Sequence, residues 1–306
     1  MADPGGRRWP APLAAGDVVT VVAPSGPFDA DRVRAGAAIL ESWGLEVRYG
    51  QHALGSHKRL SYLSADDRTR AADFTAAWTD PATSAVWAAR GGYGAQRMVD
   101  RIDFDRLRAA GPKHLVGFSD ITALHTRVGR ELGQVTIHGP VVASLTQLND
   151  APSVAQLQKL LLGHAEPGTV LARGPSVHRG LVEGRLVGGN LSLVASDLGV
   201  EPIPTEPRIA VFEDVAEDGY RVDRMLTQLL RAGWFDRVVG IVIGDFAESA
   251  EPTLIEHVVA DRLDVLGVPI LRGAQVGHGV RNLALPLGAQ VRLNATAGHA
   301  AVLTLA

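Results

Sequence analysis

The feature that most constrains the fold is a strand-like run near the start of the chain, followed by a helical pattern and a second strand-like run. Residues 17–23 read Asp-Val-Val-Thr-Val-Val-Ala, which is typical of a strand covered on both faces. Apolar positions 33, 37, 40 and 43 then share one helical face between a capping Asp29 and a terminating Gly44. Residues 45–49 alternate as a strand. This order predicts a parallel sheet with a right-handed crossover.

The same alternation continues through the first half of the chain. The patterns predict a helix over residues 66–79 and strands over residues 85–89, 115–118 and 135–137. We therefore predict an α/β protein with an N-terminal doubly wound, mostly parallel sheet.

The chain is too long for one ordinary core, and its pattern weakens between residues 148 and 179, where prolines and glycines are frequent. We predict an N-terminal domain at 13–147, a linker at 148–179 and a C-terminal domain at 180–306. Helical patterns at 220–232 and 253–266 alternate there with strand-like runs, and two closing strands follow at 289–293 and 301–305. The second domain is predicted to be smaller, an α/β mixed sheet or open barrel. The first dozen residues are interpreted as a disordered leader.

Composition narrows the chemistry. The formal net charge of -3 gives no general reason to expect nucleic acid or an anionic membrane as a partner. Cysteine is absent, so covalent catalysis would need a hydroxyl, an amine or a carboxylate. The sequence has no H-x-x-x-H or H-E-x-x-H spacing, and no apolar run reaches the roughly 18 residues of a membrane span. We predict no metal, no cofactor and no membrane association.

The most informative stretch for function surrounds Ser119. The apolar run 115–118 stops at this serine, and a helix is predicted from near Asp120. A serine at such a junction exposes its hydroxyl beside unpaired N–H groups at the positive end of a helix dipole. An acyl-transfer nucleophile needs this geometry. The alternative is that Ser119 or Asp120 simply caps the helix.

A carboxylate and a histidine follow strand-like runs in the second half. Glu213 and Asp214 end the run 209–212, and His278 lies between glycines after the run 268–271. With Ser119, these are the groups that a serine hydrolase uses, in the chain order serine, acid, histidine. The G-x-S-x-G elbow is not matched, because Ile121 stands where its last glycine is required.

The acid and the base each have an alternative. Adjacent strand positions face opposite sides, so one of Glu213 and Asp214 can reach His278, and Asp214 is interpreted as a supporting or solvent-facing charge. Asp245, which ends another strand-like run, is a second candidate for the acid. His125 lies a turn and a half along the helix from the serine and is interpreted as structural.

A glycine-rich segment, Arg90-Gly-Gly-Tyr-Gly94, directly follows the run 85–89. Glycines there bring backbone amides close to an anion, but the spacing is not G-x-G-x-x-G, which argues against a dinucleotide site. Turn formation is one interpretation. The functional interpretation is that the backbone N–H groups of Gly92 and Asp120 form an oxyanion hole.

At these positions the sequence resembles the LD-carboxypeptidases, a family of serine peptidases that includes the microcin C7 immunity hydrolases. The resemblance runs from residue 21 to about residue 291. It is carried, in order, by Ala23-Pro-Ser-Gly26, Tyr62-Leu-Ser-Ala-Asp-Asp67, Arg90-Gly-Gly-Tyr-Gly94, Gly117-Phe-Ser-Asp-Ile-Thr122, His138-Gly-Pro140, Gly188-Gly-Asn-Leu191, Glu213-Asp214 and Gly277-His278. The resemblance implies Ser119 as nucleophile, His278 as general base and Glu213 as the acid that orients the imidazole.

The resemblance also implies a substrate and a setting. A cytoplasmic homodimer would release the terminal D-alanine of murein tetrapeptides during peptidoglycan recycling, with a muropeptide as its partner. The substrate's terminal carboxylate needs a cationic contact, for which Arg90 and Arg281 are both candidates. Because the serine lies in the first half and the other two groups in the second, we expect the site in a cleft between domains.

Two other functions fit the same pattern. One is an immunity-type amidase for peptidyl aminoacyl-sulfamoyl adenylates, which would need an aromatic platform for the adenine. The loop before Gly184 has no tryptophan or tyrosine, which favours the murein substrate. The other is a non-catalytic ligand-binding α/β protein.

Overall fold

The computed structural model of the protein describes residues 6–296 and 300–306. The chain divides into two compact units, Met1–His164 and Ala165–Ala306. No helix in the described part of the chain is both long and apolar enough to cross a membrane.

The first unit alternates strands and helices. Its strands are β1 (Val18–Val22), β2 (Glu46–Tyr49), β3 (Thr83–Ala88), β4 (His114–Gly117) and β5 (Thr136–His138). Its helices are α1 (Ala30–Ser42), α2 (Asp67–Thr79), α3 (Ala95–Val99), α4 (Phe104–Ala110), the 3₁₀ turn η1 (Ser119–Ile121), α5 (Thr122–Leu132), α6 (Leu145–Leu148) and α7 (Ala151–Leu161).

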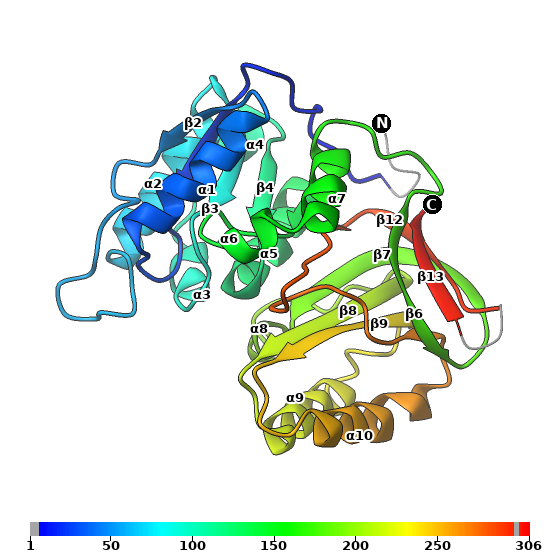
Figure 1. The fold of residues 1–306 in the computed structure, drawn as a ribbon. Coiled ribbons are helices and arrows are strands. Elements are labelled where there is room, and N and C mark those ends of the chain that lie inside the picture. The colour runs from blue at the N-terminus through cyan, green and yellow to red at the C-terminus, as the bar shows by residue number, and fades with distance from the viewer. Residues whose placement is uncertain (1–5, 297–299) are drawn as a thin grey trace. The chain divides into compact units, whose positions relative to one another are not determined.

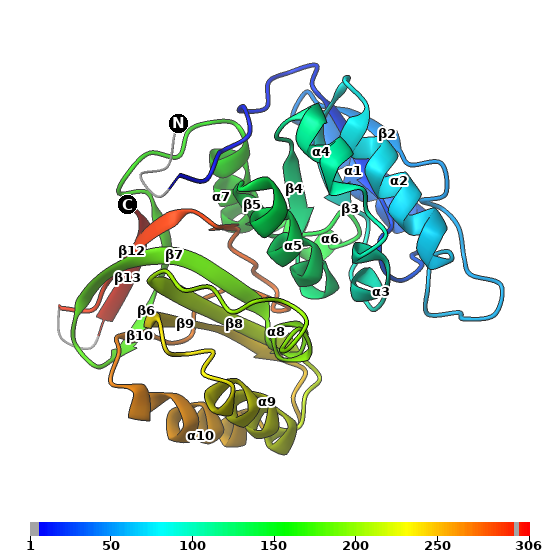
Figure 2. The ribbon, with the colours of Figure 1, turned by 180° about the vertical axis from the view of Figure 1, so that it is seen from behind.

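These strands form a parallel sheet in the order β5-β4-β3-β1-β2. Helices α1, α6 and α7 lie on the face toward the viewer in Figure 1, and α2, α3, α4 and α5 lie on the face toward the viewer in Figure 2. The predicted doubly wound sheet is therefore confirmed. The strand order reverses between β1 and β3, and in such sheets ligands bind at the carboxyl ends of the strands beside this reversal.

Two of the helix starts predicted in this unit, those of α1 and α2, are confirmed by their caps. Asp29 accepts a hydrogen bond from the Asp31 N–H at the start of α1, and Asp66 accepts one from the Thr69 N–H at the start of α2. The sequence analysis missed α3 and α4, because five and seven residues give too few turns for a periodic apolar pattern.

The second unit contains eight strands in its described residues. They are β6 (Val170–Val177), β7 (Leu181–Asn190), β8 (Arg208–Val215), β9 (Val238–Ala247), β10 (Ile270–Leu271), β11 (Leu285–Leu287), β12 (Gln290–Asn294) and β13 (Ala300–Leu305). Its helices are α8 (Leu191–Ser196), α9 (Gly219–Arg231), α10 (Pro252–Leu263) and the 3₁₀ turn η2 (Asp264–Leu266). Figure 1 shows α9 and α10 side by side along β8 and β9, where they cover an aromatic core that includes Phe212, Trp234 and Phe235.

Seven of these strands close a barrel in the order β10-β6-β13-β12-β7-β8-β9. The expected α/β class, the closing antiparallel pair β12–β13 and the mixture of parallel and antiparallel pairs in this sheet are confirmed, and the sheet closes into a barrel rather than staying open. Strand β6, which completes it by pairing with β10 and β13, lies in the stretch predicted as linker. Its Gly174 and Pro175 read as turn residues, yet Gly174 lies where a Cβ would come within 2.1 Å of the Arg272 carbonyl oxygen. The glycine thus permits a close strand approach.

The prediction of a disordered leader is wrong for the described residues of that segment. The Arg8 N–H donates to the Gly133 carbonyl, the Val135 N–H donates to the Arg8 carbonyl, and a His114 ring nitrogen contacts the Ala11 carbonyl at 2.8 Å. Residues 1–5 lie outside the described residues. The short segment is held by backbone pairing, which a composition argument does not detect.

Candidate active site

The backbone at Ser119 has a conformation that few side chains adopt. Strand β4 ends at Gly117, and Ser119 opens the 3₁₀ turn with φ of 64°, in the left-handed region. A non-glycine residue there costs about 1–3 kcal/mol and persists because its surroundings hold it. Neither the 3₁₀ turn nor α5 receives a side-chain cap, so the alternative that Ser119 or Asp120 caps the helix is wrong. Ser119 is half-buried.

The glycine-rich loop after β3 packs directly against this serine. A Cβ at Gly91 would lie 2.9 Å from the Ser119 Cβ and 3.1 Å from its Oγ, so a larger residue would displace the serine. Gly92 follows with φ of 114°. Among the described residues, neither the Gly92 N–H nor the Asp120 N–H donates to a protein group. The sequence analysis singled out Gly92 and missed the contact of Gly91.

The Asp120 side chain joins the serine turn to the turn after β1 and to the start of α3, which follows the glycine-rich loop. Its carboxylate is buried, and Oδ2 accepts hydrogen bonds from the Ser25 Oγ at 2.5 Å and from the Ala95 N–H at 2.8 Å. Burial raises the pKa of Asp120 above its ordinary value, although these two hydrogen bonds act in the opposite direction. The Asp120 backbone was predicted to have a role, and its side chain was not. The sequence signal for the side chain is a carboxylate inside an otherwise apolar stretch.

In the second unit, the structure brings Glu213 and His278 together. The His278 Nδ1 lies 2.6 Å from the Glu213 Oε2, and the Glu213 side chain is fully buried at the end of β8. Burial alone would lower the pKa of His278, but the hydrogen bond and the negative charge of Glu213 outweigh it, so the pKa of His278 is raised. A carboxylate accepts hydrogen bonds, so the Nδ1 of the imidazole carries the proton.

The loop that carries His278 is held by close packing and by hydrogen bonds. A Cβ at Gly277, which has φ of 118°, would lie 2.7 Å from the Glu213 Oε2. The Gly277 N–H donates to the Oδ1 of the buried Asn282, and the Leu283 N–H donates to the Gln275 carbonyl. The loop therefore closes on itself around the histidine. Asn282 was missed because nothing in its sequence neighbourhood marks a buried amide.

Neither alternative acid contacts the imidazole by a hydrogen bond. Asp214 is buried rather than solvent-facing, and it accepts bonds from the Asn190 amide and from the Ser192 N–H, both at 2.9 Å. Burial, with the charge of Glu213, raises the pKa of Asp214 to about 6. Asp245 lies against Gly279, where a Cβ would come within 2.4 Å of its Oδ2. The sequence could not show that Asp214 supports the start of α8.

His125 and His138 are both buried in the core of the first unit. The buried His125 Nε2 donates to the Gly117 carbonyl at 2.8 Å, and burial lowers the pKa of His125 to about 4. The predicted structural role of His125 thus fits this geometry. His138 packs edge-on against the Phe118 ring, with centroids 5.9 Å apart.

The two candidate arginines both have protein partners. The exposed Arg90 donates to the Pro27 carbonyl at 2.8 Å, and Arg281 donates to the Gln275 side-chain oxygen at 3.2 Å. Within residues 6–296 and 300–306, no group of three or more histidine and carboxylate side chains could hold a metal ion.

A serine on a strained turn at a strand end, and a histidine bonded to a buried carboxylate, are the groups that serine hydrolases use. Comparison with known families agrees with this class. The model of the LD-carboxypeptidase N-terminal domain matches residues 19–139, and that of the C-terminal domain matches residues 183–293. The chain belongs to the LD-carboxypeptidase family and is a peptidase of that type.

Curated relatives match along almost the whole chain. A putative carboxypeptidase of Streptomyces coelicolor is 43% identical and covers 94% of each chain. The murein tetrapeptide carboxypeptidase of Pseudomonas aeruginosa is 32% identical over 88% of this chain and 91% of its own.

Solved structures share the fold. The muramoyltetrapeptide carboxypeptidase of Oxalobacter formigenes matches with a TM-score of 0.80 and 27% identity, and it covers 94% of this chain and 99% of its own. An MccF-like protein of Bacillus anthracis matches with a TM-score of 0.84 over 97% of this chain and 99% of its own, and at 23% identity it shows the fold alone.

Proposed function

We propose that the protein is a serine-type LD-carboxypeptidase that releases the terminal D-alanine of murein tetrapeptides, with a Ser119–His278–Glu213 triad. The observation that supports it most is the 2.6 Å contact between the His278 Nδ1 and the buried Glu213 Oε2. With Nδ1 protonated, Nε2 is the basic nitrogen of the ring. It therefore takes the proton from the Ser119 hydroxyl as the serine attacks the peptide carbonyl.

The remaining steps follow from this assignment. The Ser119 Oγ forms a bond to the carbonyl carbon, and the resulting oxyanion accepts hydrogen bonds from the Gly92 and Asp120 backbone N–H groups. The tetrahedral intermediate collapses, the peptide C–N bond breaks, and His278 gives its proton to the leaving D-alanine amine. Water then attacks the acyl-enzyme with His278 again as base. The Glu213 carboxylate stabilises the imidazolium through its hydrogen bond to Nδ1.

The substrate's terminal carboxylate requires a cationic partner, for which Arg90 and Arg281 are the candidates. A hydrogen bond to a charged group contributes about 1.5–3 kcal/mol, which corresponds to about 10- to 150-fold in KM. Arg90→Gln and Arg281→Gln should distinguish the two candidates. Loss of the arginine that binds the carboxylate should raise KM for the tetrapeptide. The other variant should leave KM nearly unchanged.

The names of the relatives support the choice of substrate. The Pseudomonas aeruginosa relative, at 32% identity, is named for murein tetrapeptides, whereas the microcin C7 immunity proteins resemble this chain in fold at lower identity. We further propose that the enzyme acts on cytoplasmic murein fragments during recycling and that it is a homodimer. Light scattering of the purified protein tests the second point.

The direct test is D-alanine release from a purified murein tetrapeptide. Wild type should release D-alanine, and Ser119→Ala and His278→Ala should lose at least about 10³-fold in kcat. Ser42→Ala is the matched control, because this exposed serine at the end of α1 bonds the Ile39 carbonyl. Cleavage of an aminoacyl-sulfamoyl adenosine amide without tetrapeptide turnover would favour the immunity-type amidase. No cleavage of either substrate would favour a ligand-binding protein.

A further inference from the structure

The two backbone N–H groups assigned to the oxyanion come from different loops. Gly92 lies in the loop after β3 and Asp120 in the turn after β4. Gly92 and Gly94 have φ of 114° and 128°, so this loop has the conformational freedom of glycine on both sides of Tyr93. Something outside the loop must hold the distance between the two donors.

Asp120 itself supplies one such link. Its N–H is one of the assigned donors, while its Oδ2 accepts the Ala95 N–H, three residues beyond Gly92, and the Ser25 hydroxyl. The buried carboxylate thus ties the glycine-rich loop and the turn after β1 to the residue that follows the nucleophile. Hydrogen bonds from fixed donors hold this buried side chain in one position, which suits a positioning role.

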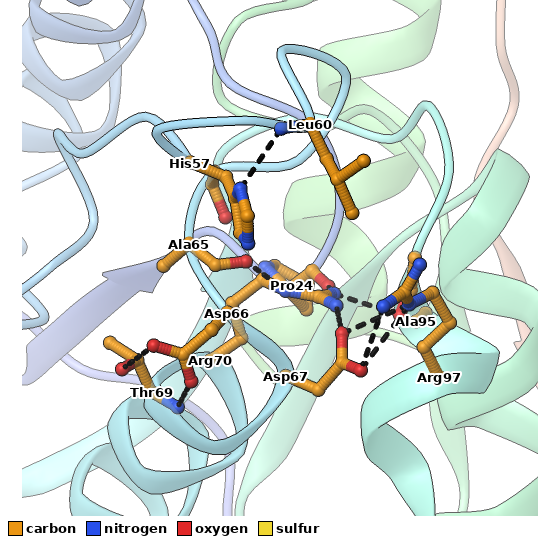
Figure 3. A network of polar contacts seen from close by, with 12 residues as sticks. Pro24, His57, Leu60, Ala65, Asp66, Asp67, Thr69, Arg70, Ala95 and Arg97 are labelled. Atoms are coloured by element: carbon orange, nitrogen blue, oxygen red, sulfur yellow. Dashed lines mark hydrogen bonds and ion pairs between the residues drawn. The ribbon is translucent and has the colours of Figure 1, made fainter.

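Arg70, on α2, supplies a second link between the same loops. Its side chain is 1% exposed, and its Nη1 donates to the carbonyl oxygens of Pro24 and Gly94, the second at 2.8 Å. Its Nε donates to the Ala65 carbonyl at 3.1 Å. Figure 3 shows the guanidinium between Pro24, Asp67 and the start of α3. A planar group with five N–H donors can bridge several carbonyls at once, which an ammonium does less well.

The buried guanidinium also explains why position 94 is occupied by glycine. A Cβ at Gly94 would lie 2.7 Å from the Arg70 Nη1, so Arg70 occupies the space of a side chain at position 94. The charge of Arg70 is balanced on its other side by Asp67, whose Oδ1 lies 2.5 Å from Nη2. Asp67 in turn pairs with Arg97 on α3.

We propose that Arg70, Asp120 and Ser25 form a loop clamp that positions the Gly92 and Asp120 N–H groups for the developing oxyanion. The three are positioning residues, since none is assigned a contact with the reacting atoms through its side chain. The inference rests on the proposed function, in which those N–H groups are the oxyanion donors. Preorganised donors act on the transition state more than on the ground state. Loss of the clamp should therefore lower kcat and leave KM nearly unchanged.

Arg70→Gln tests the clamp, with kcat and KM for the tetrapeptide measured beside the thermal midpoint. We expect kcat to fall about 10²-fold, as when one oxyanion donor is lost, with KM within about threefold of wild type. Affinity for a phosphonate analogue of the tetrahedral intermediate should fall by the same factor as kcat, while affinity for the tripeptide product should not change. Arg34→Gln, on an exposed guanidinium of α1 that pairs with Asp31, is the matched control.

A second variant decides the outcome if Arg70→Gln does not fold. Ser25→Ala removes one hydroxyl that donates to Asp120, and it should lower kcat about tenfold, the worth of one hydrogen bond to a charged group. Guanidinium ion at millimolar concentration should restore turnover to Arg70→Ala and not to Ser119→Ala. Folded Arg70→Gln or Ser25→Ala with wild-type kcat would overturn the clamp. A wild type that does not cleave the tetrapeptide would overturn the proposed function instead.

Discussion

Replacing Glu213 by glutamine changes one acceptor of the His278 Nδ1–H from a carboxylate to a neutral amide. The prediction is based on the 2.6 Å contact between the His278 Nδ1 and the Oε2 of the fully buried Glu213 carboxylate. A hydrogen bond to a charged group contributes about 1.5–3 kcal/mol and a neutral one about 0.5–1.5 kcal/mol. The difference is about 1–2 kcal/mol, and it lies at the upper end of this range where water does not screen the charge. We therefore expect kcat to fall about 30-fold.

The pH dependence gives the sharper readout. The base must be neutral, so kcat/KM rises with pH through the pKa of His278 in the free enzyme. Glu213 raises the pKa of His278, and without its charge burial lowers that pKa. The acidic limb of the kcat/KM profile for D-alanine release should therefore move to lower pH in Glu213→Gln. Steady-state assays in overlapping buffers at constant ionic strength measure this shift.

The control is the same substitution elsewhere on the second unit. Glu183→Gln alters an exposed pair with Arg292 and should leave both kcat and the acidic limb where they are in wild type. An acidic limb that stays unmoved in Glu213→Gln, with folding intact, would refute the assignment of His278 as the titrating base. A loss of kcat below about threefold would refute the orienting role of Glu213.

Three further predictions follow from backbone strain and burial. Ser119→Gly should be more stable than Ser119→Ala by about 1 kcal/mol in denaturant titrations, because glycine relieves the left-handed strain at this position. Both variants lack the nucleophile, so the comparison concerns stability alone, and equal stability would argue against the strain. Gly277→Ala should cost about 2 kcal/mol of unfolding free energy and lower kcat, since the new Cβ would press on Glu213; wild-type values would contradict this. His125 has a pKa of about 4 in the folded protein and about 6.5 in the unfolded chain, so it takes up a proton on unfolding between these two pH values. The free energy of unfolding should therefore fall by about 3 kcal/mol from this residue as pH falls through this window. His125→Gln keeps a donor for the Gly117 carbonyl. In this variant the free energy of unfolding should depend less steeply on pH between about pH 4 and pH 6.5. An unchanged slope would count against a neutral buried histidine.

Much of the fold could be predicted because its strands and helices carry simple periodic patterns. The run 17–23 became β1, buried at every position, and the residues after the strand ends carry the candidate site. Strand β6 could not be recognised, since Gly174 and Pro175 resemble a turn unless the Arg272 backbone that approaches them is known. Strand pairing between distant segments cannot be predicted from local sequence patterns.

The candidate site likewise contains residues that local sequence could predict and one that it could not. Ser119, the pair Glu213 and Asp214, and His278 were singled out for their place after strand-like runs, and the family resemblance favoured Glu213 as the acid. The contact between Glu213 and His278 fits that choice. Arg70 was not chosen, because an arginine on a helix reads as a surface residue, and its burial depends on the carbonyl groups of Pro24 and Gly94.

The two units solve the same physical problem in the same way. Each places a buried carboxylate beside a residue with positive φ at the end of a strand, Asp120 next to Ser119 and Glu213 against Gly277. A buried carboxylate opposes folding, and so does the left-handed backbone of Ser119, whereas Gly277 adopts its positive φ without strain. Hydrogen bonds from fixed donors compensate the burial of each carboxylate, which in turn holds the backbone beside it. The cost in stability therefore yields a rigid position for the serine and for the imidazole, which is what catalysis by preorganised groups requires.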